Sequence, residues 1–294
     1  MSKSLSKELR KRQHNLFLEK LGKPYDILKH IHQRKVKPEK GDWLAENYEE
    51  GQFCYTYLSD NSTCTTKKSI KIYIYLLGEF SKTQMQILEN TMVYIEAFYS
   101  VKCVIYGKIE MALIPSKYIR KNNEGITQIY TRWILQKFKK NMLDDGSVYM
   151  AISSYDLYSE EDDPTDYVFG EAYLQSRITV WSIYRNEDPF ANYTLYLKRT
   201  ISTALHEIGH TFGIQHCICF ECLMNGSNSM EESDKGVLYL CPNCLKKLMW
   251  NKNIKANINF IKKRFINLKK CCHSFKFTKE ADFYLRTIHT IENN

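Results

Sequence analysis

The chain has 294 residues, of which 44% are apolar and 26% are charged, an ordinary composition for a globular protein. It contains no apolar run of the about 18 residues that would cross a bilayer, so a membrane protein is not expected. The net charge of +9 lies mainly at the two ends of the chain. Because no aromatic-basic binding motif accompanies these charges, they indicate solvated helix faces rather than a nucleic-acid site, although acidic partners could contact them.

The N-terminal sequence and the ten cysteines bear on the cellular compartment. The first twenty residues contain no apolar segment of the kind found in a secretory signal, so a cytoplasmic location is expected, with the nucleus as an alternative. Disulfides are uncommon in such compartments. Five of the ten cysteines fall between residues 217 and 244, and this clustering predicts a metal site.

Alternating strands and helices are predicted in the first two thirds of the chain, after a basic and mainly helical extension at residues 1–68. Strands are predicted at residues 69–77, 101–109, 148–153 and 179–184, helices after Ser81 and over 127–141, and a charged loop at 159–164. Because helices that follow strands can cross back over a sheet, this order implies an α/β fold with a mainly parallel sheet.

A longer amphipathic helix is predicted from Tyr193 to Gly213. Its apolar residues recur at steps of three and four, at Leu197, Ile201, Leu205, Ile208 and Phe212. Gly213 can adopt a left-handed conformation, which would end the helix and turn the chain. Two or more helices are expected after Cys244, partly in a basic C-terminal tail at residues 249–294, which leaves residues 69–248 as the central domain.

The predicted helix carries a metal-binding motif, H-E-x-x-H-x-x-G-x-x-H, formed by His206, Glu207, His210, Gly213 and His216. Two histidines four residues apart lie on one face of a helix, where both can bind one ion. Zinc favours nitrogen ligands in tetrahedral geometry, and the turn at Gly213 would allow His216 to return as a third ligand. Three protein ligands leave one position open for water, as in catalytic zinc sites.

Glu207 is adjacent to the first histidine but points to another side of the helix. It is placed to take a proton from a zinc-bound water, whose pKa falls to about 7, and to pass that proton to a leaving amine. The sequence therefore predicts a zinc-dependent peptidase that hydrolyses peptide bonds with Glu207 as general base. A second oxyanion donor is left open among Tyr184, Tyr193 and Tyr239, each of which could equally be an ordinary core or surface tyrosine.

Four cysteines follow the motif in the pattern C-x4-C…C-x2-C, at Cys217, Cys222, Cys241 and Cys244. Four thiolates at this spacing predict a closed tetrahedral zinc site, which is structural and contributes to folding. The alternative is a group of small buried apolar residues. Cys219 lies between two of these cysteines and is interpreted as a bystander, with a role as alternative ligand kept open.

The segment from His206 to Cys244, with Met224 two residues after Cys222, resembles the archaemetzincins of eukaryotes. Residues 168–185 also resemble the family's F-G-x-A segment and edge strand, so the resemblance covers residues 69–248. It implies a zincin or metzincin fold with a twisted mixed sheet and an active-site helix, plus a small four-cysteine zinc knuckle and a helical C-terminal tail. It also implies one catalytic and one structural zinc ion, Met224 beneath the catalytic zinc, and aminopeptidase-like action on short peptides.

A second class of function stays open beside the peptidase. The chain could be a catalytically idle, zinc-stabilised binding or scaffold protein, with basic ends that contact acidic partners or nucleic acid. Glu207 favours the enzyme, because a purely structural metal site needs no acid beside its first ligand.

Overall fold

The structure is a computed structural model that describes residues 27–59, 71–140, 142–160, 167–174, 176–251 and 258–293. The chain divides into two compact units. The sheet unit comprises Thr65–Gly213, and the terminal unit comprises Met1–Cys64 together with Ile214–Asn294. Most of the predicted loop at 159–164 lies outside the described residues. The proposed domain boundaries at 68/69 and 248/249 stay predictions.

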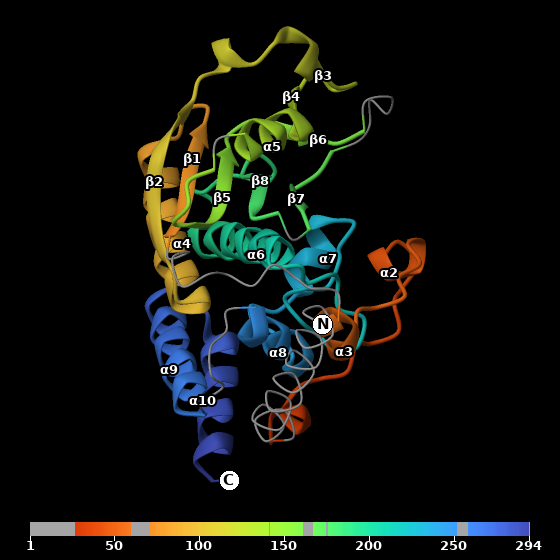
Figure 1. The fold of residues 1–294 in the computed structure, drawn as a ribbon, viewed down its shortest axis with the longest axis vertical. Helices are drawn as coiled ribbons and strands as arrows, with labels where there is room; N and C mark the ends of the chain where they lie inside the picture. The colour runs from red at the N-terminus through yellow and green to blue at the C-terminus, as the bar shows by residue number, and fades with distance from the viewer. Residues whose placement is uncertain are drawn as a thin grey trace, which may run out of the picture. The chain divides into compact units, whose positions relative to one another are not determined.

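A five-stranded sheet with strand order β2-β1-β5-β8-β7 forms the centre of the sheet unit (Figure 1). Its strands are β1 (Lys71–Leu77), β2 (Lys102–Ile109), β5 (Gly146–Ser153), β7 (Gly170–Tyr173) and β8 (Ile178–Ser182). The first four in spatial order are parallel, and β7 pairs antiparallel with β8 at the edge. The mainly parallel sheet predicted from the alternating pattern is therefore confirmed, and the expected edge strand within 168–185 is β7.

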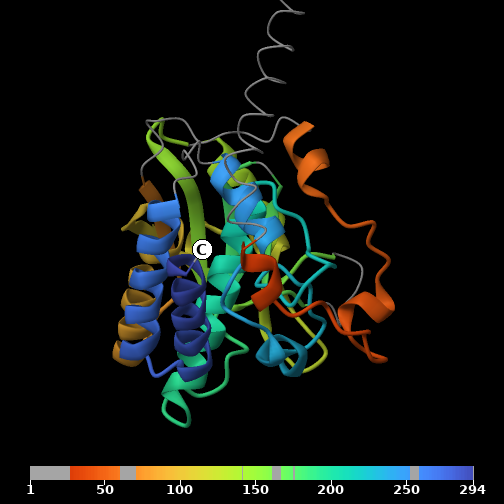
Figure 2. The same ribbon diagram turned by 90° about the horizontal axis from the view of Figure 1, so that it is seen from below.

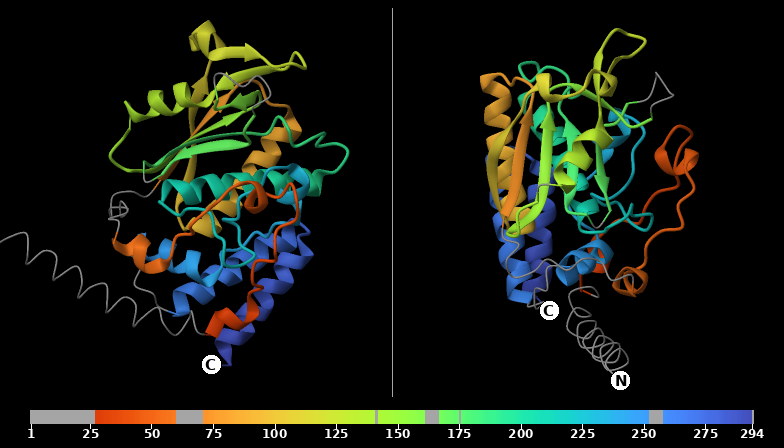
Figure 3. Two further views of the ribbon diagram at one scale, coloured as in Figure 1. Left: turned by 90° about the vertical axis from the view of Figure 1, so that its right-hand side faces the viewer. Right: turned by 45° about the horizontal axis from the view of Figure 1, so that its top comes forward.

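Helices cover both faces of this sheet (Figure 3). The helices are α4 (Lys82–Tyr99), α5 (Thr131–Lys139) and α6 (Tyr193–Thr211). Helices α4 and α6 pack together on one face, and α5 packs on the other, against β7 and β8. Ser81 begins α4 with a capping box, in which Ser81 accepts from the backbone N–H of Gln84 and the Gln84 side chain accepts from the backbone N–H of Ser81.

The helix predicted over residues 127–141 begins later than expected, and this part of the prediction is wrong. Residues Thr127–Tyr130 form strand β4, and only the residues after Tyr130 are helical. Strand β4 lies between β3 (Ile119–Lys121) and β6 (Asp156–Tyr158) in a second, three-stranded sheet. The side chain of Gln128 donates to the buried carboxylate of Asp156 at 2.9 Å. This pairing with a distant strand overrides a local pattern that also fits a helix.

The apolar core between the sheet and α5 joins the two sheets into one body. Its buried residues come from β1, β5 and β8, from α5, and from the smaller sheet, and include Tyr73, Leu77, Ile129, Ile134, Leu135, Tyr149, Leu157 and Val180. Strands β5 and β8 are buried on both faces. Their sequences are therefore mainly apolar without alternation, as is usual for parallel strands covered by helices.

The terminal unit is mostly helical. It contains η1 (Lys29–Ile31), α2 (Trp43–Glu46), α3 (Cys54–Ser59), α7 (Met230–Lys235), α8 (Pro242–Asn251), α9 (Ile258–Ser274) and α10 (Thr278–Glu292). Helices α9 and α10 lie side by side (Figure 2), and the helices expected in the C-terminal tail are confirmed. None of the helices in the described residues is long and apolar enough to span a bilayer.

A partly buried ion pair connects the two sheets and leads to a prediction about stability. Arg185 donates from Nε and Nη2 to the two carboxylate oxygens of Asp156, at 2.9 and 2.7 Å, and the Asp156 side chain is fully buried. Replacement Asp156→Ala leaves this guanidinium and the Gln128 amide without their acceptor, so the free energy of unfolding should fall by about 3 kcal/mol.

Urea unfolding of wild type and variant measures this change. Glu160→Ala is the matched control, because the pair of Glu160 with Arg132 is solvent-exposed and should be worth less than about 1 kcal/mol. Equal effects of the two substitutions would contradict the importance of the partly buried pair.

Candidate metal centres

Helix α6 brings the first two predicted metal ligands together. The Nε2 atoms of His206 and His210 are 2.9 Å apart, and both side chains are half-buried. The helix is fixed in rotation because its opposite face, which includes Leu197, Ile201 and Leu205, is buried in the unit. Two nitrogen ligands on one tetrahedral zinc ion are about 3.3 Å apart at ordinary Zn–N distances. The histidine pair therefore fits a shared zinc ion with a small adjustment.

Glu207 is almost completely buried, with 7% of its surface exposed. Its Oε2 atom is inaccessible to solvent and accepts no hydrogen bond from any described residue. Burial raises the pKa of Glu207 to about 8, and the negative charge of Glu171 contributes to the rise. Buried polar atoms in proteins nearly always have a partner, and a cation held by the neighbouring histidines would favour the ionised carboxylate. The unpartnered oxygen thus fits a site completed by a metal ion and water.

Strand β7 contacts the Glu207 carboxylate through Gly170. A Cβ atom at position 170 would lie 2.7 Å from Cγ and 2.9 Å from Oε1 of Glu207, so only glycine leaves room for the carboxylate in this position. The next residue, Glu171, accepts a hydrogen bond from the Thr131 hydroxyl. The edge strand therefore limits where the carboxylate can lie and adds a negative charge near it.

Gly213 ends the helix as expected. It has a φ of 78°, in the left-handed region that favours glycine, and its N–H donates to the carbonyl of His210 at 2.8 Å. The chain then enters the terminal unit, where the third predicted ligand, His216, is the third residue after Gly213.

Within the terminal unit, His216 is held by two residues from the N-terminal part of the chain. Its Nδ1 atom is 2.6 Å from Oε1 of Glu49. The same oxygen accepts a hydrogen bond from Nε1 of Trp43 at 2.6 Å, and the Trp43 ring meets the His216 ring edge-on, with centroids 5.2 Å apart.

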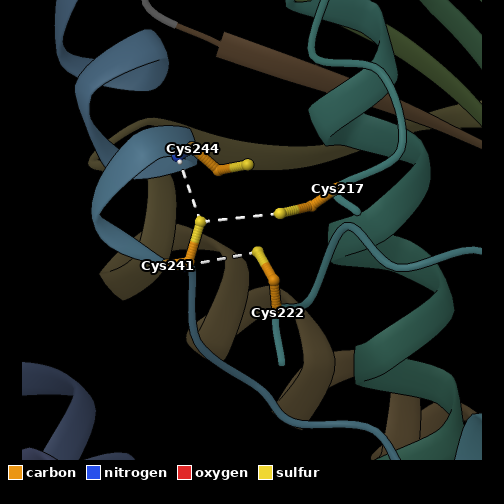
Figure 4. A group of neighbouring side chains, drawn as sticks. All are labelled: Cys217, Cys222, Cys241 and Cys244. Atoms are coloured by element: carbon orange, nitrogen blue, oxygen red, sulfur yellow. Dashed lines mark hydrogen bonds between the residues drawn. The ribbon is translucent and has the colours of Figure 1, made fainter. Parts of the chain in front are cut away.

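The four predicted cysteine ligands form a compact, fully buried cluster in the terminal unit (Figure 4). Cys217 and Cys222 come from the loop after His216, and Cys241 and Cys244 from the start of α8. Their sulfur atoms all lie within 4.8 Å of one another. Hydrogen bonds from the other three thiols lower the pKa of Cys217, so the cluster already favours a thiolate before a cation is added.

The sulfur geometry matches tetrahedral zinc. The Sγ atoms of Cys217 and Cys241 are 3.7 Å apart, and two sulfur ligands on one zinc ion are about 3.8 Å apart at ordinary Zn–S distances. Backbone N–H groups also point at sulfur, with Cys241 donating to Cys222 Sγ at 3.2 Å and Cys244 to Cys241 Sγ at 3.5 Å. Such donors favour thiolates. The residues present therefore fit a structural zinc ion.

The loop that carries the first two cysteines is held from within by Asn225. Its amide donates to the carbonyls of Cys217 and Phe220, and its Oδ1 accepts from the N–H of Cys222 at 2.9 Å. Met224 is completely buried, and its carbonyl accepts from the N–H of Cys217 at 2.7 Å. Cys219 is only half-buried and does not belong to the cysteine group, which agrees with its interpretation as a bystander.

The three tyrosines considered as oxyanion donors lie in different surroundings. Tyr184 is 44% exposed. Tyr193 begins α6 and accepts from the Asn90 amide, and the helical rise puts it about 20 Å from His206. Tyr239 stacks on Phe283 in the terminal unit. These contacts do not single out an oxyanion donor among them.

Four residues of these surroundings were missed by the sequence-based reasoning: Trp43, Glu49, Gly170 and Asn225. Trp43 and Glu49 contact His216, and Gly170 contacts Glu207, each at least 37 positions away in the chain, and no spacing rule connects such distant positions. Asn225 is close to its partners, and its place immediately after Met224 in a cysteine-rich loop was a usable signal.

Comparisons of this chain with a family model and with known proteins agree on one family. The model of the family described as peptidase family M54 matches residues 68–250. Archaemetzincin-2 of Rattus norvegicus is 30% identical over 245 residues, which cover 71% of this chain and 67% of that protein. The archaemetzincin of Thermococcus kodakarensis is 38% identical over 106 residues, which cover 35% of this chain and 55% of that protein.

A solved structure agrees with these sequence matches. The crystal structure of archaemetzincin from Methanopyrus kandleri superposes with a TM-score of 0.53 at 25% sequence identity, and the match covers 64% of this chain and 98% of that one. The family match spans more than half of the chain, and the relatives carry the same family name in sequence and in structure. The chain therefore belongs to peptidase family M54, the archaemetzincin family of zinc metallopeptidases.

Proposed function

We propose that this chain hydrolyses peptide bonds with Glu207 as the general base, and that it binds two zinc ions, one catalytic and one structural. The observation that carries the proposal is the Glu207 carboxylate, which is buried beside a pair of converging histidines and has an oxygen without a partner among the described residues. An acceptor of this kind requires a donor that the described residues do not supply, and an attacking water in the active enzyme would be such a donor.

The catalytic zinc ion is assigned to His206, His210 and His216. The motif spacing and the close approach of the first two Nε2 atoms support this assignment. When bound, zinc supplies a Lewis acid that polarises a scissile carbonyl and lowers the pKa of water.

Glu207 then moves the proton. Its Oε2 atom accepts a proton from the attacking water and delivers it to the nitrogen of the leaving amine. Gly170 allows the carboxylate to stay in place for both transfers, because its missing side chain leaves the space that Cγ and Oε1 of Glu207 occupy beside β7.

The preferred substrate is proposed to be a short peptide cleaved from its N-terminus. This finer statement rests on the resemblance of the motif region to the archaemetzincins. It is tested with two sets of fluorogenic peptides of the same sequences, one with free and one with acetylated N-termini. Faster cleavage of the free peptides supports aminopeptidase-like action, and equal rates contradict it.

The general base is tested by Glu207→Gln. The amide keeps the size of the side chain but cannot take a proton, so peptide hydrolysis should fall at least about 100-fold while zinc content is unchanged. Cleavage rates and zinc per chain are measured together on the same samples.

The matched control is Glu110→Gln, an exposed carboxylate directly after β2, which should cleave like wild type. Wild-type rates in Glu207→Gln would refute the assigned role. Two zinc ions with no cleavage by any of the proteins would favour the zinc-stabilised binding or scaffold protein instead.

The structural zinc is tested by Cys222→Ser. This change replaces one buried ligand, so zinc should fall from two ions to one per chain, and thermal unfolding should occur at a lower temperature because metal binding contributes to folding. Cys219→Ser is the control and should keep both ions. Retention of two zinc ions by Cys222→Ser would contradict the four-cysteine site.

A further inference from the structure

We propose that Glu49 is a positioning residue for His216, which it holds in one tautomer and one orientation for zinc binding. The inference rests on the proposed function only in taking His216 as a zinc ligand. Glu49 lies outside residues 68–250, the part of the chain that matches the family, and outside the metal-binding motif.

The hydrogen bonds around Glu49 determine the tautomer of His216. An indole N–H is a donor only, so the bond from Trp43 Nε1 shows that Oε1 of Glu49 acts as an acceptor. The contact of 2.6 Å between this oxygen and His216 Nδ1 therefore needs the proton on Nδ1. The lone pair of the imidazole is then on Nε2, and this tautomer can bind a metal ion through that atom.

Glu49 and His216 are sufficiently buried for the carboxylate to influence the imidazole. Both side chains are about one-fifth exposed, so solvent screens their interaction less than it would screen a surface pair. A carboxylate that accepts from the distal nitrogen of a metal-binding histidine fixes the ring and makes its ligand nitrogen more basic. The edge-on contact with the Trp43 ring restricts rotation of the imidazole further.

Trp43 is itself held firmly within the terminal unit. Its backbone N–H donates to both carboxylate oxygens of Glu232, at 3.1 and 3.0 Å. A Cβ atom at Gly226 would lie 2.5 Å from Cδ1 of Trp43, so the glycine is needed for the indole to fit. Glu232 and Gly226, which follow the metal-binding motif in the chain, thus hold in place the indole that donates to the Glu49 carboxylate.

Gln52, three residues after Glu49, provides a second contact with the loop that carries His216 and with α8. The side-chain oxygen of Gln52 accepts from the N–H of Gln215 at 3.2 Å. The backbone carbonyl of Gln52 accepts from the ammonium of the buried Lys247. Gly51 has a φ of 76°, and a Cβ atom there would clash with Ile218. Residues 43–52 are therefore fastened along the loop that carries His216, which allows Glu49 to act as a fixed acceptor.

The test measures zinc affinity at the histidine site by chelator competition in wild type, Glu49→Ala and Glu49→Gln. Loss of such an outer carboxylate typically weakens metal binding about 10- to 100-fold, and this range is expected for Glu49→Ala. Glu49→Gln keeps an acceptor oxygen without the charge, so its affinity should lie between those of wild type and Glu49→Ala. The cysteine site should keep its affinity in every variant.

The matched control is Glu50→Gln, which removes the charge of the adjacent, exposed glutamate and should leave both affinities unchanged. Trp43→Phe keeps a ring but removes the indole donor, and a loss of a few-fold is expected there. This variant and Glu49→Gln carry the test if Glu49→Ala fails to fold, which circular dichroism would show.

The outcomes separate this inference from the proposed function. A wild-type chain whose histidine site binds no zinc would overturn the catalytic site itself. Two zinc ions in wild type with unchanged affinities in the Glu49 variants would overturn only the positioning role. An equal loss of zinc affinity in Glu49→Gln and Glu50→Gln would also overturn the positioning role. The loss would then follow from removing any negative charge in this part of the chain.

Discussion

The packing of one face of α6 inside the sheet unit is the interaction on which the site depends. Burial of Leu197, Ile201 and Leu205 fixes the rotation of the helix, and the helical period then decides where every other side chain points. His206 and His210 emerge one turn apart on the half-buried side, and Glu207 turns toward β7. Rotation of the helix by a fraction of a turn would move Glu207 away from β7, so the packing of the core determines where the proposed base and ligands lie.

The parts of the molecule that the sequence predicts well are those determined by neighbours in the chain. The capping box at Ser81, the apolar repeat of α6 and the left-handed turn at Gly213 are all local. The four cysteines could be grouped because metal-ligand spacing is itself a sequence signal. Strand β4 was missed, because the choice of Thr127–Tyr130 between helix and strand is made by its pairing with β6, far along the chain.

The same distinction applies within the site. The proposed histidine ligands and the proposed base belong to a motif of eleven residues and were predicted from its spacing. The groups that orient them come from other segments, as Gly170 does beside Glu207 and Glu49 beside His216. A glycine in a strand and a glutamate in an irregular segment carry no periodic signal, so only the folded chain reveals what they contact.

His216 and Cys217 are consecutive residues, and this adjacency couples two kinds of chemistry. The Cys217 side chain belongs to a buried cluster that holds its loop in one conformation. One peptide bond joins this residue to His216. Oxidation of these thiols to disulfides would change the geometry of the loop at the residue next to the histidine. Oxidising conditions that leave Glu207 unchanged would thereby act on His216 through the backbone.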